Sequence, residues 1–459
     1  MDLHKMVSML SKKELVELVM DLTDGDEDVA KKVEYKLSTP HDEVKASKQL
    51  IRQYINENKR RGFISWRNVH AALRGAEMVL EKGRNKLVSG EEELAVRLGI
   101  TVLSIVIDML QYTDDSGGEI GYIVNESMTM LKDASSLVLL STEHREQDRI
   151  FQLILDEALH KRYDGWNDIR HELLEVCTIY TARASARKKL ESTLEKLLTK
   201  VSSISSWSSD YDQKSIKMLQ LKVLERNGEL EKAQKFINEN LKFDEFREMA
   251  IEKDMANEQF TSALKLCEDG EENDSKYPGL VKKWKQYRLQ IYEALEDLDK
   301  QKEILREFVF DNDYESYNKL KEFYSPEEWQ PVVDEIFTEL EEKSDHLPYI
   351  YEYMAKAEER EDKILKYCEE SPITVLELYP YLLDGYAAKV DEIFTSFLKS
   401  EAEQASDRKQ YRSVCKKLEI YHKACGETKF RGIVEELKET YNRKPAFVNE
   451  LEKVERLFG

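Results

Sequence analysis

The hexapeptide VDEIFT occurs twice in this chain, as Val333–Thr338 and again as Val390–Thr395, 57 residues further on. On a helix, each copy places Val, Ile and Phe on one face, at positions i, i+3 and i+4, while Asp, Glu and Thr point away from it. The recurrence of this apolar stripe indicates that one packing position recurs along the chain. The hexapeptide therefore predicts helical repeats that bury their apolar faces against their neighbours.

Four helix-to-helix junctions share a second pattern. Each consists of an apolar helix, a short acidic turn and a helix that mixes basic and apolar residues; the turns centre on Gly228, Glu296, Glu358 and Gly426. The spacings of 68, 62 and 68 residues correspond to two stacked helical hairpins, because hairpin repeats of this kind are about 34 residues long. We therefore predict tetratricopeptide-like hairpins over residues 210–459.

Composition extends the helical prediction to the rest of the chain. Only 8 prolines and 17 glycines occur in 459 residues, and only Pro40 precedes Pro278, whereas sheets need frequent turn residues. Long segments rich in Glu, Lys and Leu favour helices almost throughout. Apolar heptads are not sustained, which argues against a coiled coil. The predicted fold is an all-α solenoid.

The remainder of the chain is predicted to form two further helical segments. Residues 1–145 are expected to be a helical bundle or the beginning of the solenoid, and residues 146–209 a helical connector. The connector ends in the stretch VSSISSWSSDYD, where six serines lie between Ser202 and Ser209. A polar run of this kind is typical of a boundary, so we expect the repeats to begin at residue 210.

Charge and cysteine content argue against several classes of protein. Acidic residues outnumber basic ones by 91 to 70, giving a net charge of −21, which repels phosphate backbones and anionic lipids unless a basic face is kept apart. The five cysteines are scattered without a C-x-x-C pair, so neither a disulfide framework nor a zinc site is indicated. No signal peptide or membrane span is recognisable, and we expect a cytoplasmic protein without a cofactor.

The loop YTDDSGGEIG, Tyr112–Gly121, is the candidate for a metal site. Asp114 and Asp115 precede two glycines, as in a calcium loop, but Val124 stands where such a loop needs a bidentate glutamate. A helix break, with Asp114 or Ser116 capping the next helix, is the simpler interpretation. An enzymatic alternative rests on this loop and His171. Because no nucleotide-binding or hydrolase motif occurs, we predict that the protein is not an enzyme.

Two basic clusters with interleaved aromatic residues are candidates for nucleic-acid binding, because cations neutralise phosphate and aromatic rings stack on bases. One lies around Arg60 and the other around Lys283; their basic members are Lys59, Arg60, Arg61, Arg67, Lys282, Lys283 and Lys285. A solvated helix face with aromatic residues in the core gives the same pattern and is the alternative interpretation.

Several stretches resemble, in the same order, the helical region of bacterial SWIM zinc-finger proteins and related helical-repeat proteins. They are TDDSGGEIG, RYDGWNDIRHELLEVC, KFDEFREMAIEKD, DSKYPGLVKKWKQYRLQIYEAL and YNRKPAFVNELEKV, and the resemblance extends from about residue 45 to the end. The zinc finger itself needs C-x-C followed by C-x-H, and this chain has neither, so zinc binding does not transfer. The resemblance implies a tetratricopeptide-like scaffold beside a helicase-type partner, accessory to a DNA-processing or defence system.

These observations favour a non-enzymatic scaffold that presents a concave surface to a protein partner. A peptide or helix would lie along inward-facing residues, and the acidic turns and net charge favour a basic ligand. The side chains expected to contact the partner are Tyr287, Arg288, Tyr324, Trp329 and Tyr381. The alternative is a nucleic-acid-binding accessory protein that uses the clusters around Arg60 and Lys283.

Overall fold

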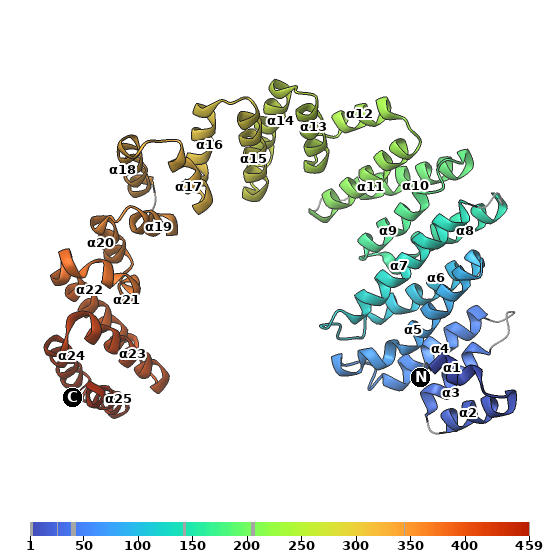
Figure 1. Cartoon of the computed structure of the whole chain (residues 1–459), viewed down its shortest axis with the longest axis horizontal. Helices are drawn as coiled ribbons and strands as arrows, with labels where there is room; N and C mark the ends of the chain where they lie inside the picture. Colours follow the sequence, from blue (N-terminus) through green and yellow to red (C-terminus); the bar gives the residue numbers. More distant parts are fainter. Residues whose placement is uncertain are drawn as a thin grey trace. The chain divides into compact units, whose positions relative to one another are not determined.

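The computed structural model describes residues 3–24, 26–37, 43–140, 144–202, 207–343 and 345–458. In these residues the chain forms α-helices α1 to α25, joined by short turns, and no β-strand (Figure 1). The predicted all-α fold is therefore confirmed. Among the described residues, no helix combines the length and the apolar character that a membrane span requires.

The chain divides into two compact units, residues 1–247 and residues 248–459. The first unit contains α1 (Leu3–Ser8), α2 (Lys12–Asp24), α3 (Glu27–Lys36), α4 (Glu43–Asn58), α5 (Trp66–Val88), α6 (Glu92–Met109), α7 (Glu119–Val138), α8 (His144–Ala158), α9 (Asn167–Thr178), α10 (Ala184–Ser202), α11 (Trp207–Arg226), α12 (Leu230–Glu239) and the beginning of α13 (Asp244–Ala256). The second unit contains the rest of α13, then α14 (Phe260–Asn273), α15 (Pro278–Ala294), α16 (Leu298–Phe310), α17 (Tyr314–Glu322), α18 (Pro326–Lys343), α19 (Tyr349–Ala357), α20 (Glu361–Glu370), α21 (Val375–Leu378), α22 (Leu383–Gln404), α23 (Arg408–Cys425), α24 (Glu427–Thr440) and α25 (Pro445–Phe458).

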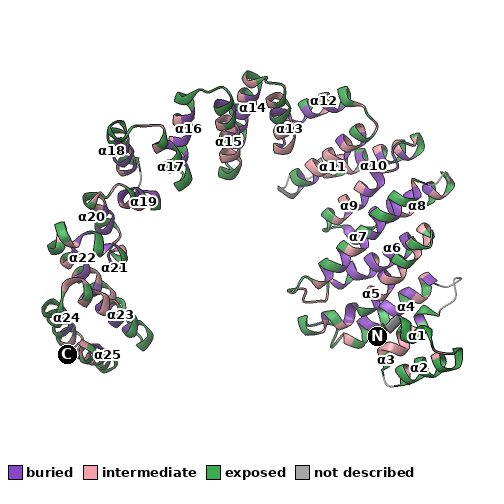
Figure 2. Ribbon diagram, in the orientation of Figure 1, coloured by how far each residue is buried: buried purple, intermediate pink, exposed green. Residues whose placement is uncertain are grey.

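Helices in each unit pack in chain order. The substantial contacts between described α-helices join elements that are one or two positions apart in the chain, such as α6 with α7 and α5 with α7. An amphipathic helix must bury its apolar stripe against another element, and in both units the buried residues lie where successive helices meet (Figure 2). This nearest-neighbour packing is that of an α-solenoid.

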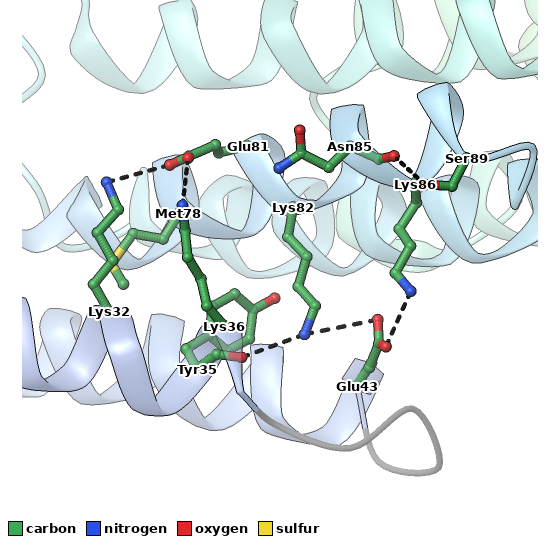
Figure 3. Close-up of a pocket in the computed structure, with 10 residues that line it drawn as sticks. All are labelled: Lys32, Tyr35, Lys36, Glu43, Met78, Glu81, Lys82, Asn85, Lys86 and Ser89. Carbon is green, nitrogen blue, oxygen red and sulfur yellow. Dashed lines mark hydrogen bonds and ion pairs between the residues drawn. The ribbon is translucent and has the colours of Figure 1, made fainter. Parts of the chain in front are cut away.

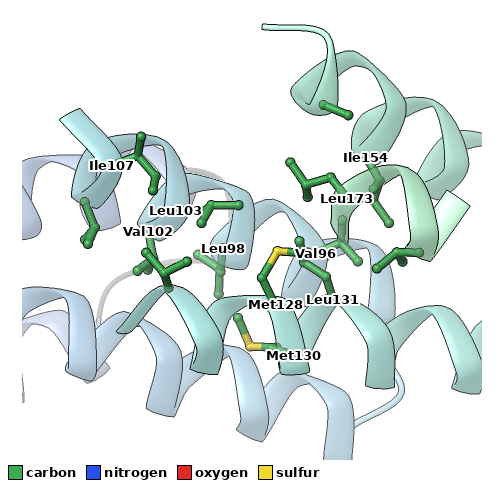
Figure 4. Close-up of a cluster of buried hydrophobic side chains, with 14 of the residues drawn as sticks. Val96, Leu98, Val102, Leu103, Ile107, Met128, Met130, Leu131, Ile154 and Leu173 are labelled. Atoms are coloured by element: carbon green, nitrogen blue, oxygen red, sulfur yellow. The ribbon is translucent and has the colours of Figure 1, made fainter. Parts of the chain in front are cut away.

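The core of the first unit forms around α6, which is apolar on nearly all sides. Eleven of its residues are buried, and Figure 4 shows Val96 beside Leu131 of α7. Helices α5, α6 and α7 approach closely because Gly83 and Gly99 have no Cβ. A Cβ at either position would crowd the side chain of Met130 of α7. One continuous hydrophobic cluster extends from α3 through α11.

The predicted segment limits at residues 145 and 209 stay predictions. In the serine-rich stretch, Ser203–Ser206 lie outside the described residues, while α10 ends at Ser202 and α11 begins at Trp207. The hydrophobic cluster of the first unit contains side chains from both sides of each limit, so one core continues across both positions.

Both copies of VDEIFT lie on helices of the second unit, the first on α18 and the second on α22. The Val, Ile and Phe side chains of each copy are buried in the same hydrophobic cluster: Val333, Ile336 and Phe337, and Val390, Ile393 and Phe394. The Asp, Glu and Thr residues of both copies are exposed or half-buried. The predicted burial of the Val, Ile and Phe face in both copies is confirmed, whereas the equivalence of the two packing positions stays a prediction.

Six turns between consecutive helices share one geometry. In each, a residue with φ between 51° and 73° follows the helix, and the next residue donates a backbone hydrogen bond to the carbonyl five positions back; the left-handed residues are Gly90, Gly228, Glu258, Glu296, Asn312 and Glu359. This is the Schellman arrangement, which satisfies the last carbonyls of a helix. Three of the four predicted junctions have it. The fourth differs, because Gly426 has φ 84° and ψ 170° and caps the start of α24.

Charged residues connect the hairpins of the second unit through a recurring contact. A carboxylate on one element accepts a hydrogen bond from a tyrosine hydroxyl and pairs with at least one lysine ammonium group, and most of these donors lie on other helices. The four cases are Glu248 with Tyr287 and Lys283, Glu341 with Tyr351, Lys363 and Lys366, Glu358 with Tyr317 and Lys321, and Asp391 with Tyr421 and Lys429.

Glu341 on α18 is the most heavily bonded of these carboxylates. It lies 2.6 Å from the Tyr351 hydroxyl, 2.8 Å from Lys363 Nζ and 2.7 Å from Lys366 Nζ, and so joins α18 to α19 and α20. Burial alone would raise the pKa of Glu341, but the bonds from these three donors outweigh it and lower the pKa to about 2.

We predict that Glu341→Gln destabilises the protein at neutral pH and that its difference from wild type shrinks in acid. Because the folded pKa lies below the ordinary value of 4.5, the carboxylate contributes stability above that value, and the contribution is lost as the pH falls towards 2. We expect a loss of about 1–2 kcal/mol in unfolding free energy at neutral pH, since solvent screens part of the contact.

Urea unfolding of the full chain, followed by circular dichroism from neutral pH down to about pH 3, measures this difference. Glu342→Gln is the matched control, because Glu342 is an exposed neighbour on the same helix. A difference between Glu341→Gln and wild type that stays constant over this range would contradict the proposed role of the carboxylate.

Candidate interaction surface

The basic cluster around Lys283 lies on α15, in the middle of a set of ion pairs between helices. Its cations pair with carboxylates on four neighbouring elements: Lys282 with Asp313 at 2.8 Å, Lys283 with Glu248 at 2.6 Å, Lys285 with Glu307 at 2.7 Å and Arg288 with Glu271 at 3.0 Å. Trp284, between them, is fully buried and its indole N–H donates to Asp274. The cluster predicted to bind nucleic acid is therefore internally neutralised and connects α15 to its neighbours.

Two residues predicted to contact a partner belong to the same internal network. The hydroxyl of Tyr287 donates to Glu248 and Glu252, at 2.9 Å and 3.0 Å, and burial together with these carboxylates raises the pKa of Tyr287. Arg288 Nη1 lies 3.0 Å and 3.1 Å from the two carboxylate oxygens of Glu271. Both side chains hold α15 against α13 and α14.

Trp329 and Tyr324, also predicted as partner contacts, pack together at the junction of α17 and α18. Trp329 is buried in the core and its indole N–H donates to Glu358, at 2.9 Å. The ring of Tyr324 lies 5.8 Å from that of Trp329, and Lys302 Nζ lies 4.5 Å from the Tyr324 ring. The structure thus places Trp329 in the interior instead of on a binding surface, because its apolar ring completes the packing between hairpins.

Tyr381 is the predicted contact residue that the structure leaves most open, being 50% exposed at the end of a 3-10 turn, Tyr379–Tyr381. Lys356 of α19 lies 5.8 Å from its ring. Tyr349 and Tyr353 precede Lys356 on the same face of α19, and Tyr349 is 73% exposed. The ring of Tyr314, which begins α17, lies 4.8 Å from that of Tyr353. We call these five residues the tyrosine face.

Four members of the tyrosine face, all except Tyr381, are absent from the sequence-based prediction, although the sequence contains a signal for two of the tyrosines. In the stretch PYIYEYMAK, tyrosines stand at positions 349, 351 and 353, so the first and third share a helix face that the second does not. In the structure Tyr351 is fully buried, while Tyr349 is exposed. Alternating tyrosines at the start of a short helix therefore divide between the core and the surface.

The tyrosine face belongs to the more acidic of the two units. Residues 248–459 contain 49 acidic and 32 basic residues, a net charge of −17, whereas residues 1–247 contain 42 and 38, a net charge of −4. The negative charge of the chain is therefore concentrated in the unit that presents these tyrosines, and the field there favours cations.

The basic cluster around Arg60 is arranged differently, as a tight hairpin between α4 and α5. Arg60 and Phe63 exchange backbone hydrogen bonds of 2.9 Å and 3.0 Å around Arg61 and Gly62, which have φ of 51° and 85°. Positive φ at both central residues is typical of a two-residue hairpin loop. We call Lys59–Arg67 the arginine hairpin.

The arginine hairpin presents both cations and aromatic rings to solvent. Phe63 and Trp66 are 50% and 58% exposed. Arg60, Arg61 and Arg67 are exposed, and none of the three forms an ion pair with a carboxylate in the described part of the chain. Lys59 is half-buried, and its Nζ lies 3.4 Å from the centre of the Tyr112 ring.

The hairpin lies against the loop that carries Asp114 and Asp115. Ile64 exchanges backbone hydrogen bonds of 3.0 Å with Tyr112 and Asp114, so two motifs that are about 50 residues apart in the sequence form one structure. Asp114 accepts from the Ser116 N–H at 3.1 Å and Asp115 accepts from the Ile120 N–H at 2.9 Å. Both carboxylates therefore order the turn before α7, and the loop is a helix break as predicted. The predicted capping residue differs: the N-cap is Gly118, and Asp115, instead of Asp114 or Ser116, bonds to the first turn of the helix.

The described residues contain no group of three or more His, Cys, Asp and Glu side chains placed to hold a metal ion. His171, the other residue of the enzymatic alternative, lies on α9, where burial lowers its pKa. Its Nδ1 accepts or donates no hydrogen bond within the described part of the chain. No described hydrogen bond joins it to Asp114 or Asp115.

Comparisons with known proteins place the chain in a family. No curated protein matches it. A solved structure described as a "Circular tandem repeat protein with novel repeat topology and enhanced subunit contact surfaces" is similar to it, with 15% sequence identity, a TM-score of 0.24 and coverage of 96% of this chain and 95% of that chain. A family model matches residues 4–324, whereas the resemblance to SWIM zinc-finger proteins stays a prediction. Because that match spans most of the chain, this protein belongs to the family of unknown function DUF6880.

Proposed function

We propose that this protein is a non-enzymatic helical-repeat scaffold, and that it binds a basic segment of a protein partner at the tyrosine face. The observation that carries the proposal is the group of tyrosines gathered from α17, α19 and the turn before α22, on the strongly acidic unit. Tyr349 and Tyr381 are 73% and 50% exposed, so burial in the core does not explain the presence of these two rings.

Tyrosine suits such a site for physical reasons. Its ring supplies a large, rigid contact area, its hydroxyl can remain hydrogen-bonded, and it is among the residues that dominate binding energy at interfaces. Lysine and arginine side chains of a ligand can lie over the ring faces, as the protein's own Lys356 does over Tyr381. The surrounding negative charge would speed the association of a basic partner.

The proposal includes the cytoplasmic location expected from the sequence. The SWIM resemblance adds a helicase-type or other DNA-processing partner. The non-enzymatic part is supported by the engagement of Asp114 and Asp115 in backbone hydrogen bonds. The concave surface predicted from the sequence stays a prediction.

A photo-crosslinking amino acid at position 349, introduced in the native host, tests the proposal by identifying the bound polypeptide. The identified polypeptide is then purified, and its affinity is measured by titration for the wild-type protein and for the double variant Tyr349→Ala/Tyr381→Ala. We expect the double variant to bind about tenfold more weakly or worse, because two anchor rings are removed, and wild-type binding to weaken as salt increases.

Tyr277→Ala is the matched control, because Tyr277 is a similarly exposed tyrosine of the same unit, before α15. It should bind as wild type does. Equal affinity of the double variant and wild type would contradict the proposed site, and binding that does not respond to salt would contradict the basic character of the partner.

A second candidate function, nucleic-acid binding, is favoured by the arginine hairpin alone. Its two exposed rings and three exposed guanidinium groups have the composition of a single-strand binding surface, in which bases stack on aromatic side chains and cations neutralise phosphates. The unit that carries it is nearly neutral, with 42 acidic and 38 basic residues. The cluster around Lys283 is not part of this proposal.

Fluorescence polarisation with a labelled oligo(dT) strand at low salt tests this candidate. We expect Arg60→Glu/Arg61→Glu to lower affinity at least tenfold, because two phosphate contacts are lost and two repulsive charges are added, and to flatten the salt dependence of binding. Lys188→Glu/Lys196→Glu is the charge-matched control, since both lysines are exposed on α10 of the same unit. Absence of wild-type binding at low salt, or equal loss in the control, would contradict this function.

A further inference from the structure

A cavity of about 320 Å³ lies between α3, the start of α4 and α5, away from the surfaces described above (Figure 3). Ten residues line it: Lys32, Tyr35, Lys36, Glu43, Met78, Glu81, Lys82, Asn85, Lys86 and Ser89. Its volume is at the small end of the range for ligand-binding pockets. Four of the ten residues are lysines, contributed by two helices.

Among the described residues, four lysines line the cavity and two carboxylates line it with them. Glu81 pairs with Lys32 and Lys36, at 3.4 Å and 2.9 Å. Glu43 pairs with Lys86 at 3.2 Å and with Lys82 at 3.7 Å. The lining thus carries four positive and two negative charges, and positive charge remains in excess even when Glu91, which also pairs with Lys86, is included.

Burial makes this excess positive charge significant. The side chains of Lys82 and Lys86 are only 13% and 17% exposed, so water screens them less than it screens surface lysines. Burial lowers the pKa of Lys82, against the opposing effect of Glu43. An anion in the cavity would stabilise the charged form of this side chain and so oppose the lowering of its pKa.

Glu43 adds a second requirement for a ligand. Its side chain is almost completely buried, and its Oε2 lies 3.7 Å from Lys82 Nζ, an ion pair that is too long for a hydrogen bond. A hydroxyl group on a ligand would supply the hydrogen-bond donor that this buried acceptor lacks among the described residues. Figure 3 shows the Glu43 carboxylate between the ammonium groups of Lys82 and Lys86.

The geometry points to a binding site for a small phosphate monoester that carries hydroxyl groups. The phosphate dianion balances the excess positive charge of the lysines, a hydroxyl donates to Glu43, and Met78 and the ring of Tyr35 form the less polar wall for the carbon skeleton. The size of the cavity excludes a polymer such as a nucleic acid strand, which separates this site from the arginine hairpin.

Isothermal titration of the full chain with glycerol 3-phosphate, methyl phosphate, inorganic phosphate and chloride tests the assignment. We expect glycerol 3-phosphate to bind most tightly, because it provides both the dianion and hydroxyl donors, and methyl phosphate to bind several-fold more weakly. Chloride should give no saturable heat. Equal affinity for glycerol 3-phosphate and methyl phosphate would overturn the role of Glu43, and no binding of any phosphate at millimolar concentration would overturn the site.

Two variants with opposite expected effects locate the binding in this cavity. Lys36→Gln should weaken glycerol 3-phosphate binding about tenfold, because it removes one cation, whereas Glu81→Gln should strengthen it by a similar factor, because it releases Lys32 and Lys36 from their carboxylate. Both side chains are about half exposed, so neither change should unfold the protein, which thermal melting checks.

Lys188→Gln on α10 is the control for loss of a lysine elsewhere in the unit. It should bind glycerol 3-phosphate as wild type does. If Lys36→Gln and Glu81→Gln change the affinity in the same direction, or leave it unchanged, the ligand binds outside this cavity and the assignment is wrong.

Discussion

In the described part of each unit, the substantial contacts between helices join helices that are one or two positions apart in the chain, and the remaining features depend on this constraint. Such packing demands the same apolar stripe at each equivalent position, which is why VDEIFT recurs with its Val, Ile and Phe buried in both copies. It also requires chain reversals after short helices, which the repeated left-handed turn provides even where the residue is glutamate or asparagine.

Charged residues support the same nearest-neighbour packing. In a chain that is 35% charged, carboxylates between hairpins accept hydrogen bonds from tyrosine hydroxyls and lysine ammonium groups of adjacent helices. These side chains are therefore engaged within the protein, although their sequence pattern alone would suggest binding sites. Against that background, the surfaces that keep exposed rings or excess charge are informative. The tyrosine face, the arginine hairpin and the lysine-lined cavity differ in the side chains that they present.

The repeat could be predicted from the sequence because its signal is local: an apolar stripe fits within six residues and a turn within four. The environment of the basic clusters could not be predicted from the sequence. Lys283 pairs with Glu248, 35 residues earlier on another helix, and no local pattern distinguishes it from Arg61, which has no such partner among the residues that the structure describes. Trp329 was assigned to a surface for the same reason, since its burial depends on Glu358 and Tyr317 from neighbouring elements. Local sequence thus specifies helices and turns, whereas pairing between hairpins decides which side chains remain available.

Hydrogen exchange of Phe337→Ala, measured by mass spectrometry, tests the nearest-neighbour account most directly. Phe337 belongs to the first VDEIFT copy, is fully buried and lies 5.0 Å from the ring of Tyr351 on α19, so its truncation leaves a cavity between two hairpins. The account predicts faster exchange in α18, α19 and α20, with α23, α24 and α25 unchanged, because stability in a stack of repeats is lost locally. Uniformly faster exchange across residues 248–459 would instead indicate a single cooperative globule and contradict it.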